Sequence, residues 1–225
     1  MAHSPTCSKT QLKPTRVLLV DDHPIVRERL AEIISREPDL VVCAEAEDRH
    51  GAIKAAETSK PELAVIDLAL KNSSGLELIK DLHALWPRLI ILVVSMQEES
   101  LYAERALRAG AQGYITKQEA TRNIMVAIRR VLDGEIYLSG KAASTVISHL
   151  TAKPQAGGSV ADRLTDRELQ VFELTGTGLS TKGIAERLCI DVKTVETYRI
   201  RIKEKLDLKD SSELLQMAIR WSQDR

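Results

Sequence analysis

The chain has 225 residues, and its 32 basic residues balance 32 acidic ones, so its formal net charge is zero. This balance excludes a protein that coats nucleic acid or an anionic membrane by bulk electrostatics, although it permits a small basic surface. Because domains typically hold roughly 100–200 residues, the length fits two domains. The 44% apolar content is enough for each domain to bury a core.

Membrane insertion and secretion are not expected. The longest aliphatic run, Leu89 to Val94, is far shorter than the roughly 18–20 residues that a membrane-spanning helix needs. The polar segment Met1 to Pro14 has no charged-then-apolar signal pattern, so we expect a cytoplasmic protein without membrane contact. Cys7, Cys43 and Cys189 are widely spaced and form no C-x-x-C pair, which indicates reduced thiols rather than disulfides or a zinc site.

In the first part of the chain, short β-branched runs alternate with longer amphipathic stretches. The expected strands are Val17 to Val20, Leu40 to Ala44, Leu63 to Ile66, Ile90 to Val94 and Gly113 to Thr116. The expected helices are Pro24 to Ser35, His50 to Thr58, Leu76 to Leu85, Glu98 to Ala109 and Ala120 to Leu132. Strands without polar alternation are covered on both faces. The pattern therefore predicts a doubly wound α/β domain, a (βα)5 parallel sheet, over residues 15–138.

A linker is expected over residues 139–161. It contains one further expected helix, Lys141 to Leu150, and then a Pro/Gly/Ser-rich hinge at Pro154 to Ser159. After it, strand-like runs disappear and helical periodicity continues. Residues 162–225 are therefore predicted to form a small all-α domain.

Four short helices are predicted in this second domain. The capping box Thr165-x-x-Glu168 opens the first, which Gly176 and Gly178 end. The other three begin at a Ser180 cap, at an Asp191 cap and at Glu213, and they reach Leu188, about Leu206 and Trp221 respectively. The second and third are joined by a three-residue turn, which is typical of a helix-turn-helix motif.

Three carboxylates follow strands of the first domain. Asp21 and Asp22 come after the first strand and Asp67 after the third. Ligands of open α/β sheets bind at this edge. Clustered carboxylates are costly unless a cation neutralises them, and Mg²⁺ prefers such oxygen ligands. The alternative is that Asp21 or Asp22 merely caps the following helix.

Two further polar residues, Ser95 and Lys117, end the fourth and fifth strands. The set suits phosphoryl chemistry at a carboxylate. Asp67 would attack, the metal and Lys117 would neutralise the oxyanions, and Ser95 would donate a hydrogen bond.

At this point residues 15–138 resemble the receiver domain of two-component response regulators. The resemblance rests on Val17-Leu-Leu-Val-Asp-Asp22, Asp67 with Gly75 eight residues on, Val94-Ser95, and Ala109-Gly-Ala-x-Gly-Tyr-x-x-Lys117. It implies that Asp67 is the phosphoacceptor, which forms 4-aspartylphosphate. It further implies a Ser95–Tyr114 switch pair, a Lys117 contact to the phosphoryl group and a sensor histidine kinase as phosphodonor. The implied Mg²⁺ ligands are Asp21, Asp22, Asp67 and the backbone carbonyl of Ala69.

Two residues depart from the family pattern. After the phosphoacceptor the family usually has a polar residue at the second position and often Pro at the fourth, where this chain has Ala69 and Lys71. A backbone carbonyl at Ala69 still permits metal binding, so the departures bear on phosphorylation kinetics.

The third helix of the second domain is the expected recognition helix. Val195, Ile202 and Leu206, with Tyr198 beside them, form its expected buried side. Residues 193–209 contain six basic and three acidic residues, so this segment is basic although the domain is nearly neutral. Such a helix suits the major groove of double-stranded DNA, and a solvated charged helix is the alternative.

Residues 163–221 resemble the LuxR-type helix-turn-helix. The residues that carry this are Leu164-Thr-x-Arg-Glu-Leu, Gly178-Leu-Ser-x-Lys-x-Ile-Ala, Leu188, Ile190, Lys193-Thr-Val-Glu-Thr-Tyr and Lys205-Leu206. With the receiver, the chain resembles a NarL/FixJ-type response regulator. Glu196 and Tyr198 depart from the Lys and His common in the family, so the operator sequence cannot be transferred. The expected DNA-contacting residues are Lys193, Thr194, Glu196, Thr197, Ile200, Arg201, Lys203 and Lys205.

The resemblance implies a transcription factor, not an enzyme, that is controlled by phosphorylation. In the family, phosphorylation draws in the serine, rotates the tyrosine inward and frees a recognition helix that the receiver covers. A homodimer on DNA would form through Leu215, Ile219 or Trp221. One alternative is a phosphorylation-independent receiver that acts as a protein-interaction and dimerisation module. The other is a phosphotransferase or nucleotide-binding enzyme, which has no nucleotide-binding glycine motif to support it.

Overall fold

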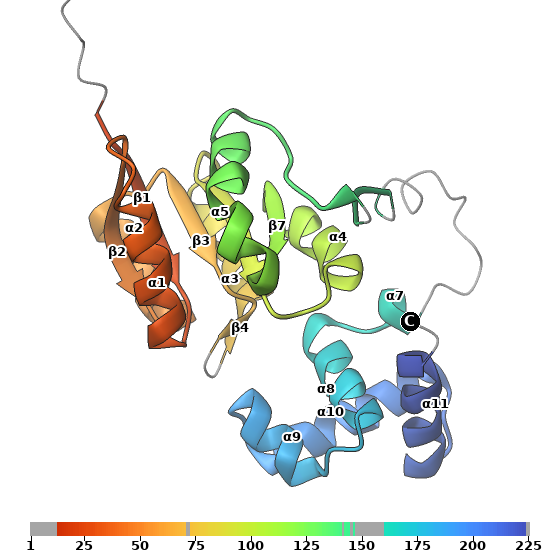
Figure 1. Ribbon diagram of the computed structural model, residues 1–225. Coiled ribbons are helices and arrows are strands. Elements are labelled where there is room, and N and C mark those ends of the chain that lie inside the picture. The colour runs from red at the N-terminus through yellow and green to blue at the C-terminus, as the bar shows by residue number, and fades with distance from the viewer. Residues whose placement is uncertain (1–12, 71–72, 141, 145, 147–159, 224–225) are drawn as a thin grey trace, which may run out of the picture.

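The computed structural model describes residues 13–70, 73–140, 142–144, 146 and 160–223. The predictions for Cys7, Lys71 and the hinge at 154–159 lie outside these residues. An α/β domain comes first, and a smaller helical domain follows (Figure 1). Within the described ranges, every helix is too short or too polar to cross a membrane.

The α/β domain is built on one parallel sheet. Its strands are β1 (Thr15–Val20), β2 (Leu40–Ala46), β3 (Leu63–Ile66), β6 (Ile90–Ser95) and β7 (Gly113–Thr116). They are hydrogen-bonded in the order β2-β1-β3-β6-β7. The predicted doubly wound sheet is therefore confirmed, and its strand order reverses between β1 and β3, where ligands bind in such sheets.

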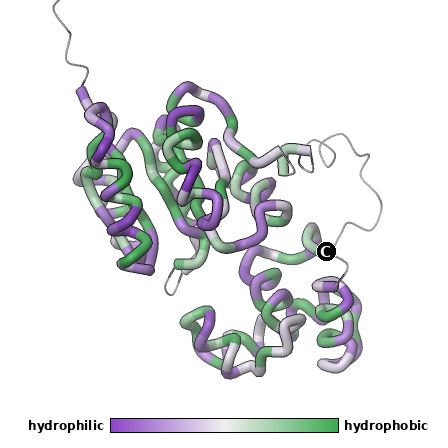
Figure 2. The backbone as a smooth tube through the Cα atoms, viewed as in Figure 1, coloured by the Kyte–Doolittle hydropathy of each residue, from purple (hydrophilic) through white to green (hydrophobic). Residues whose placement is uncertain are grey.

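Helices cover both faces of the sheet. They are α1 (Pro24–Ile34), α2 (Arg49–Ser59), α3 (Gly75–Leu85), α4 (Glu99–Ala109) and α5 (Lys117–Leu132). Apolar residues of α1 and α5 pack on one face, and those of α2, α3 and α4 pack on the other. The strands between them are mostly hydrophobic (Figure 2), as burial on both faces requires.

Three local features differ from the sequence prediction. Helix α5 begins at Lys117 rather than Ala120, because the Thr116 hydroxyl caps it by accepting from the Glu119 N–H at 3.2 Å. A short hairpin of β4 (Ala69–Leu70) and β5 (Ser73–Ser74) follows Asp67. Tyr137 adds a parallel bridge to the edge of β7. The hairpin and the bridge are too short to produce a periodic pattern.

The helical domain contains α7 (Val160–Arg163), α8 (Asp166–Gly176), α9 (Thr181–Leu188), α10 (Val192–Leu206) and α11 (Ser211–Gln223). The predicted capping box of Thr165 and Glu168 is confirmed, as is the Ser180 cap. Asp191 is the N-cap residue of α10, as predicted, but its carboxylate makes no capping hydrogen bond, and its backbone carbonyl accepts from Thr194 N–H at 2.9 Å. Helix α7 was not predicted. Of the helix expected at Lys141 to Leu150, the described residues 142–144 and 146 are helical.

Candidate functional site

The carboxyl edge of the sheet gathers the predicted acidic residues. Asp21 follows β1 and Asp67 follows β3, and because these strands are adjacent, the two carboxylates lie close together. Both residues are buried, at 2% and 3% exposure. One potential ligand atom from each of Asp21, Asp22, His23 and Asp67 lies within 4.8 Å of the others. Sequence analysis missed His23, whose Nδ1 lies 2.7 Å from Oδ1 of Asp22.

Lys117 binds two of these carboxylates. Its Nζ lies 2.6 Å from Oδ2 of Asp21 and 2.7 Å from Oδ2 of Asp67. The second oxygen of Asp67 accepts the Ala69 N–H at 3.1 Å. The ammonium therefore neutralises part of the carboxylate repulsion, and both oxygens of Asp67 have a donor.

Burial raises the pKa of the Asp67 carboxyl, and Lys117 only partly offsets this effect. Burial alone would lower the pKa of Lys117, but the carboxylates of Asp67 and Asp21 outweigh this effect. The pKa of Lys117 is therefore raised. A buried carboxylate with a shifted pKa beside a fixed cation is typical of a functional site.

The same cluster can hold a divalent metal ion. Its carboxylate oxygens are the donors that Mg²⁺ prefers, and their mutual distances permit shared ligation. Asp21 hydrogen-bonds the His23 N–H at 2.8 Å, but no side chain caps α1. The alternative of a simple helix cap therefore explains little of the cluster.

Ser95 and Tyr114 lie beside the acidic cluster, and both are fully buried. The Tyr114 hydroxyl donates to the backbone carbonyl of Gln97 at 3.0 Å, and Ser95 Oγ accepts the Gln97 N–H at 3.3 Å. Burial raises the pKa of Tyr114 well above its ordinary value. Tyr114 is therefore already inward in this structure, whereas the family pattern led us to expect inward rotation as a separate event.

Gly75 is required by the loop that carries Asp67. A Cβ at this position would lie 2.3 Å from the backbone oxygen of Asp67 and 2.5 Å from Cα of Leu68. The Gly75 N–H also donates to the Leu68 carbonyl at 3.0 Å. The glycine thus lets the start of α3 approach the loop that carries Asp67.

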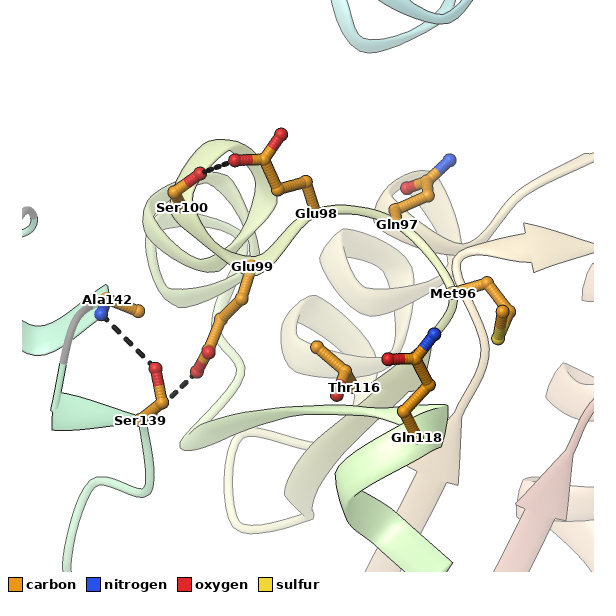
Figure 3. Close-up of a pocket in the computed structure, with 9 residues that line it drawn as sticks. All are labelled: Met96, Gln97, Glu98, Glu99, Ser100, Thr116, Gln118, Ser139 and Ala142. Carbon is orange, nitrogen blue, oxygen red and sulfur yellow. Dashed lines mark hydrogen bonds between the residues drawn. The ribbon is translucent and has the colours of Figure 1, made fainter. Parts of the chain in front are cut away.

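A pocket of about 330 Å³ opens between the β6–α4 loop, the start of α5 and the segment after Tyr137. Figure 3 shows Glu99 pointing from α4 toward Ser139, whose N–H donates to Glu99 Oε1 at 2.7 Å. Helix α4 thereby holds the segment that leaves the α/β domain.

Helix α10 presents most of the predicted DNA-contacting residues to solvent. Lys193, Glu196, Thr197, Ile200 and Arg201 are exposed, and the partly buried residues are Thr194, Lys203 and Lys205. Lys205 Nζ lies 2.6 Å from Glu168 Oε2 of the α8 capping box. Lys205 is therefore engaged within the domain, whereas the side chains of Lys193 and Arg201 have no ion-pair partner among the residues that the structure describes.

The predicted dimerisation residues of α11 differ in their surroundings. Leu215 is 38% exposed. Ile219 is partly buried, and Trp221 packs edge-on against Phe172 with ring centroids 5.5 Å apart. Trp221 therefore contributes to the core of its own domain, which its position in the sequence did not indicate.

Comparison with known proteins assigns both parts of the chain. Residues 17–129 match the response regulator receiver domain, and residues 162–218 match the LuxR family of bacterial regulatory proteins. Response regulator GacA of Pseudomonas aeruginosa is 33% identical over 205 residues, which cover 91% of this chain and 95% of GacA. Transcriptional activator protein ExaE of Pseudomonas putida is 34% identical over 203 residues, covering 90% and 95%.

A structure of the RcsB response regulator of Salmonella typhimurium shares the fold. It superposes with a TM-score of 0.64 at 22% identity, over 92% of this chain and 98% of that one. The matches to GacA and ExaE span about nine tenths of this chain, so they include both the receiver and the helix-turn-helix domain that follows it. The chain therefore belongs to the NarL/FixJ-type two-component response regulators, which are transcription regulators with a receiver and a LuxR-type helix-turn-helix domain and are not enzymes.

Proposed function

We propose that a sensor histidine kinase phosphorylates Asp67 and that this modification controls sequence-specific DNA binding by α10. The observation that carries the proposal is the placement of buried Asp67 against Lys117 Nζ at 2.7 Å, inside a cluster able to bind a metal ion. We assign residues 15–138 to the receiver, 139–161 to the linker and 162–225 to the DNA-binding domain. The protein would act in the cytoplasm.

The phosphoryl transfer is a substitution at phosphorus. A carboxylate oxygen of Asp67 forms the new P–O bond while the P–N bond of the kinase phosphohistidine breaks, and the imidazole leaves with the bonding electron pair. Lys117 neutralises charge on the phosphoryl oxygens, and the Ala69 N–H orients the carboxylate. The hydroxyl of Ser95, a buried residue, would contact the phosphoryl group.

Mg²⁺ would be held by the carboxylates of Asp21, Asp22 and Asp67 together with the backbone carbonyl of Ala69. The bound ion supplies positive charge that stabilises the phosphoryl oxygens. With Ala69 at the second position after Asp67, the side chain at that position is a methyl group, which is too short to reach over the phosphoryl group.

On DNA, we propose that a homodimer places two α10 helices in successive major grooves. Lys193 and Arg201 would contact phosphates, while Thr197, Ile200 and Glu196 would face base edges. Leu215 and Ile219 of α11 would contribute to the dimer contact, because their side chains are at least partly accessible.

A small acyl phosphate tests the proposal. The full chain is incubated with Mg²⁺ and acetyl phosphate, and intact mass is measured before and after treatment with base. We expect one base-labile phosphoryl adduct that is absent in Asp67→Asn. Absence of any adduct in the wild-type chain would contradict the proposal.

A phosphorylation-independent receiver remains the second candidate, and one observation favours it. Tyr114 already occupies the inward position, with its hydroxyl bound to the Gln97 carbonyl. In that case wild-type and Asp67→Asn chains would bind DNA equally, with or without acetyl phosphate.

A further inference from the structure

Polar residues of α4 bind the DNA-binding domain, beside buried apolar residues of both domains that form one hydrophobic cluster. Tyr102 and Arg105 are three residues apart and so lie on the same side of this helix. The Tyr102 hydroxyl donates to Glu173 Oε2 at 2.6 Å, and Arg105 Nη1 lies 2.5 Å from Asp166 Oδ1. Both acceptors belong to α8, which lies near α4 (Figure 1).

Arg105 is the most highly connected residue of this contact. Its Nη2 donates to the Leu164 carbonyl at 3.0 Å and also to the Ala161 carbonyl. Lys80 of α3 lies 3.2 Å from the other carboxylate oxygen of Asp166. Because Arg105 and Asp166 are only 18% and 15% exposed, these charge-assisted bonds are of the stronger kind.

The contact reaches the inner side of the recognition helix. Arg167 lies in the first turn of α8, where burial lowers the pKa of its guanidinium. Lys205 of α10 binds Glu168 in the same first turn of α8 that contains Asp166. The first turn of α8 therefore connects the receiver with α10.

The opposite side of α10 is uncovered. Lys193, Thr197 and Arg201 are exposed, and Ile200 is 52% exposed, although the receiver is docked. This arrangement differs from the family expectation that the receiver covers the recognition helix. The physical reason is that the polar partners of α4 lie on α7 and α8.

We propose that docking of the receiver through Tyr102 and Arg105 orients α10 and leaves its DNA-contacting face open. The inference rests on the proposed DNA-binding role of α10. Two recognition helices must match the spacing of successive major grooves. A docked receiver would therefore control how two DNA-binding domains pair on DNA, rather than whether DNA can reach each α10.

Chemical accessibility tests this inference in the full chain. A zero-length carbodiimide links Lys80 to Asp166 when the domains are docked, and an amine-reactive reagent labels Lys193 when its face is open. Both products are quantified by mass spectrometry in the wild type, in the double variant Tyr102→Phe/Arg105→Ala, and in Arg108→Ala. Arg108 is the matched control, since it pairs with Glu104 of the same helix at 2.6 Å.

We expect the Lys80–Asp166 product in the wild type and in Arg108→Ala. In the double variant it should fall by about tenfold, because the charge-assisted hydrogen bonds that hold α4 against α8 are removed. Labelling of Lys193 should be the same in all three proteins. Faster labelling of Lys193 in the double variant would overturn the inference, as would absence of the cross-link in the wild type.

Binding to a random-sequence duplex separates this inference from the proposed function. Equal affinity of the wild type and the double variant supports the open face, whereas tighter binding by the double variant overturns it. If Lys193→Ala and Arg201→Ala leave duplex binding unchanged, the DNA-binding role of α10 fails, while the labelling result still reports on docking.

Discussion

The ammonium of Lys117 lies 2.7 Å from Oδ2 of Asp67, at the point where β3 and β7 bring the two residues to one edge of the sheet. The same ammonium lies 2.6 Å from Asp21. Lys117 therefore holds the acidic cluster together, and in the proposed function it would also meet an incoming phosphoryl group. This dual position leads to the first prediction.

Replacing Lys117 by Met should slow phosphorylation of Asp67. The cation that neutralises the phosphoryl oxygens is removed, and loss of one such electrostatic group typically costs about 10²–10³-fold in rate. The rate of adduct formation with acetyl phosphate and Mg²⁺ measures the effect. Lys54→Ala, an exposed lysine of α2, serves as the control. An unchanged rate in Lys117→Met would exclude this role.

Replacing Gly75 by Ala should destabilise the receiver. The added Cβ meets the backbone of Asp67 and Leu68, which cannot move as a flexible side chain would. We expect a loss of about 1–3 kcal/mol in the free energy of unfolding, measured with urea, together with slower phosphorylation. Gly140→Ala is the matched control, because its Cβ would meet nothing within 4 Å. Equal stability of the two variants would show that the approach at Gly75 is not tight.

Glu168→Gln should destabilise the DNA-binding domain in a pH-dependent manner. Burial would raise the pKa of Glu168, but hydrogen bonds from Lys205 and Thr165 lower it below its ordinary 4.5. A lowered folded-state pKa contributes stability above the unfolded value, and this contribution is lost as the pH falls through the folded value. The deficit of the variant, about 1–2 kcal/mol, should therefore be present at neutral pH.

Urea unfolding of the helical domain, measured across the acid range, checks this prediction. The free energies of unfolding of the wild type and Glu168→Gln should become equal at pH values below the ordinary glutamate pKa. Glu204→Gln, which changes an exposed residue of α10, should have the stability of the wild type at every pH. If the stability deficit of Glu168→Gln does not change with pH, the ionised carboxylate of Glu168 is not its cause.

Substitutions of Trp221 and Leu215 should affect different properties, the first the stability of the helical domain and the second dimerisation. Trp221→Ala removes the ring that packs on Phe172, so we expect a loss of about 2–3 kcal/mol, less than for a fully buried tryptophan. Leu215→Ala removes an accessible side chain and should change stability little but weaken self-association on DNA. Thermal unfolding and sedimentation velocity measure the two effects. The reverse pattern would contradict the placement of both residues.

Lys193→Ala and Arg201→Ala should each weaken DNA binding, most strongly at low salt. Removing one phosphate contact reduces the slope of log affinity against log salt by about 1. Fluorescence anisotropy with a duplex over a range of NaCl concentrations measures the slope, and Lys54→Ala again provides the control. If the slopes of all three variants equal that of the wild type, α10 does not contact the phosphates.

Periodicity and motif spacing predicted most of the fold. Uninterrupted apolar runs identified every strand of the main sheet, and the Thr165–Glu168 box identified the start of α8. Asp21, Asp67 and Lys117 could be grouped because residues that follow parallel strands meet at one edge. The β4–β5 hairpin and α7 were missed because segments of two to four residues carry no periodic signal.

The contact between domains could not be predicted from one sequence. Tyr102, Arg105 and Asp166 are ordinary residues of polar helices, and only tertiary packing brings α4 against α8. The inward position of Tyr114 depends in the same way on the Gln97 carbonyl, which belongs to a loop. Sequence patterns specify which side of a helix is apolar, but not which polar side chain finds a partner on another domain.

The most direct test of phosphorylation control is the affinity of the full chain for DNA before and after modification of Asp67. A duplex selected from a random pool is titrated with the wild type and with Asp67→Asn, each with and without acetyl phosphate and Mg²⁺. We predict that acetyl phosphate raises the affinity of the wild type and leaves that of Asp67→Asn unchanged. Equal affinities under all four conditions would contradict control of DNA binding through Asp67.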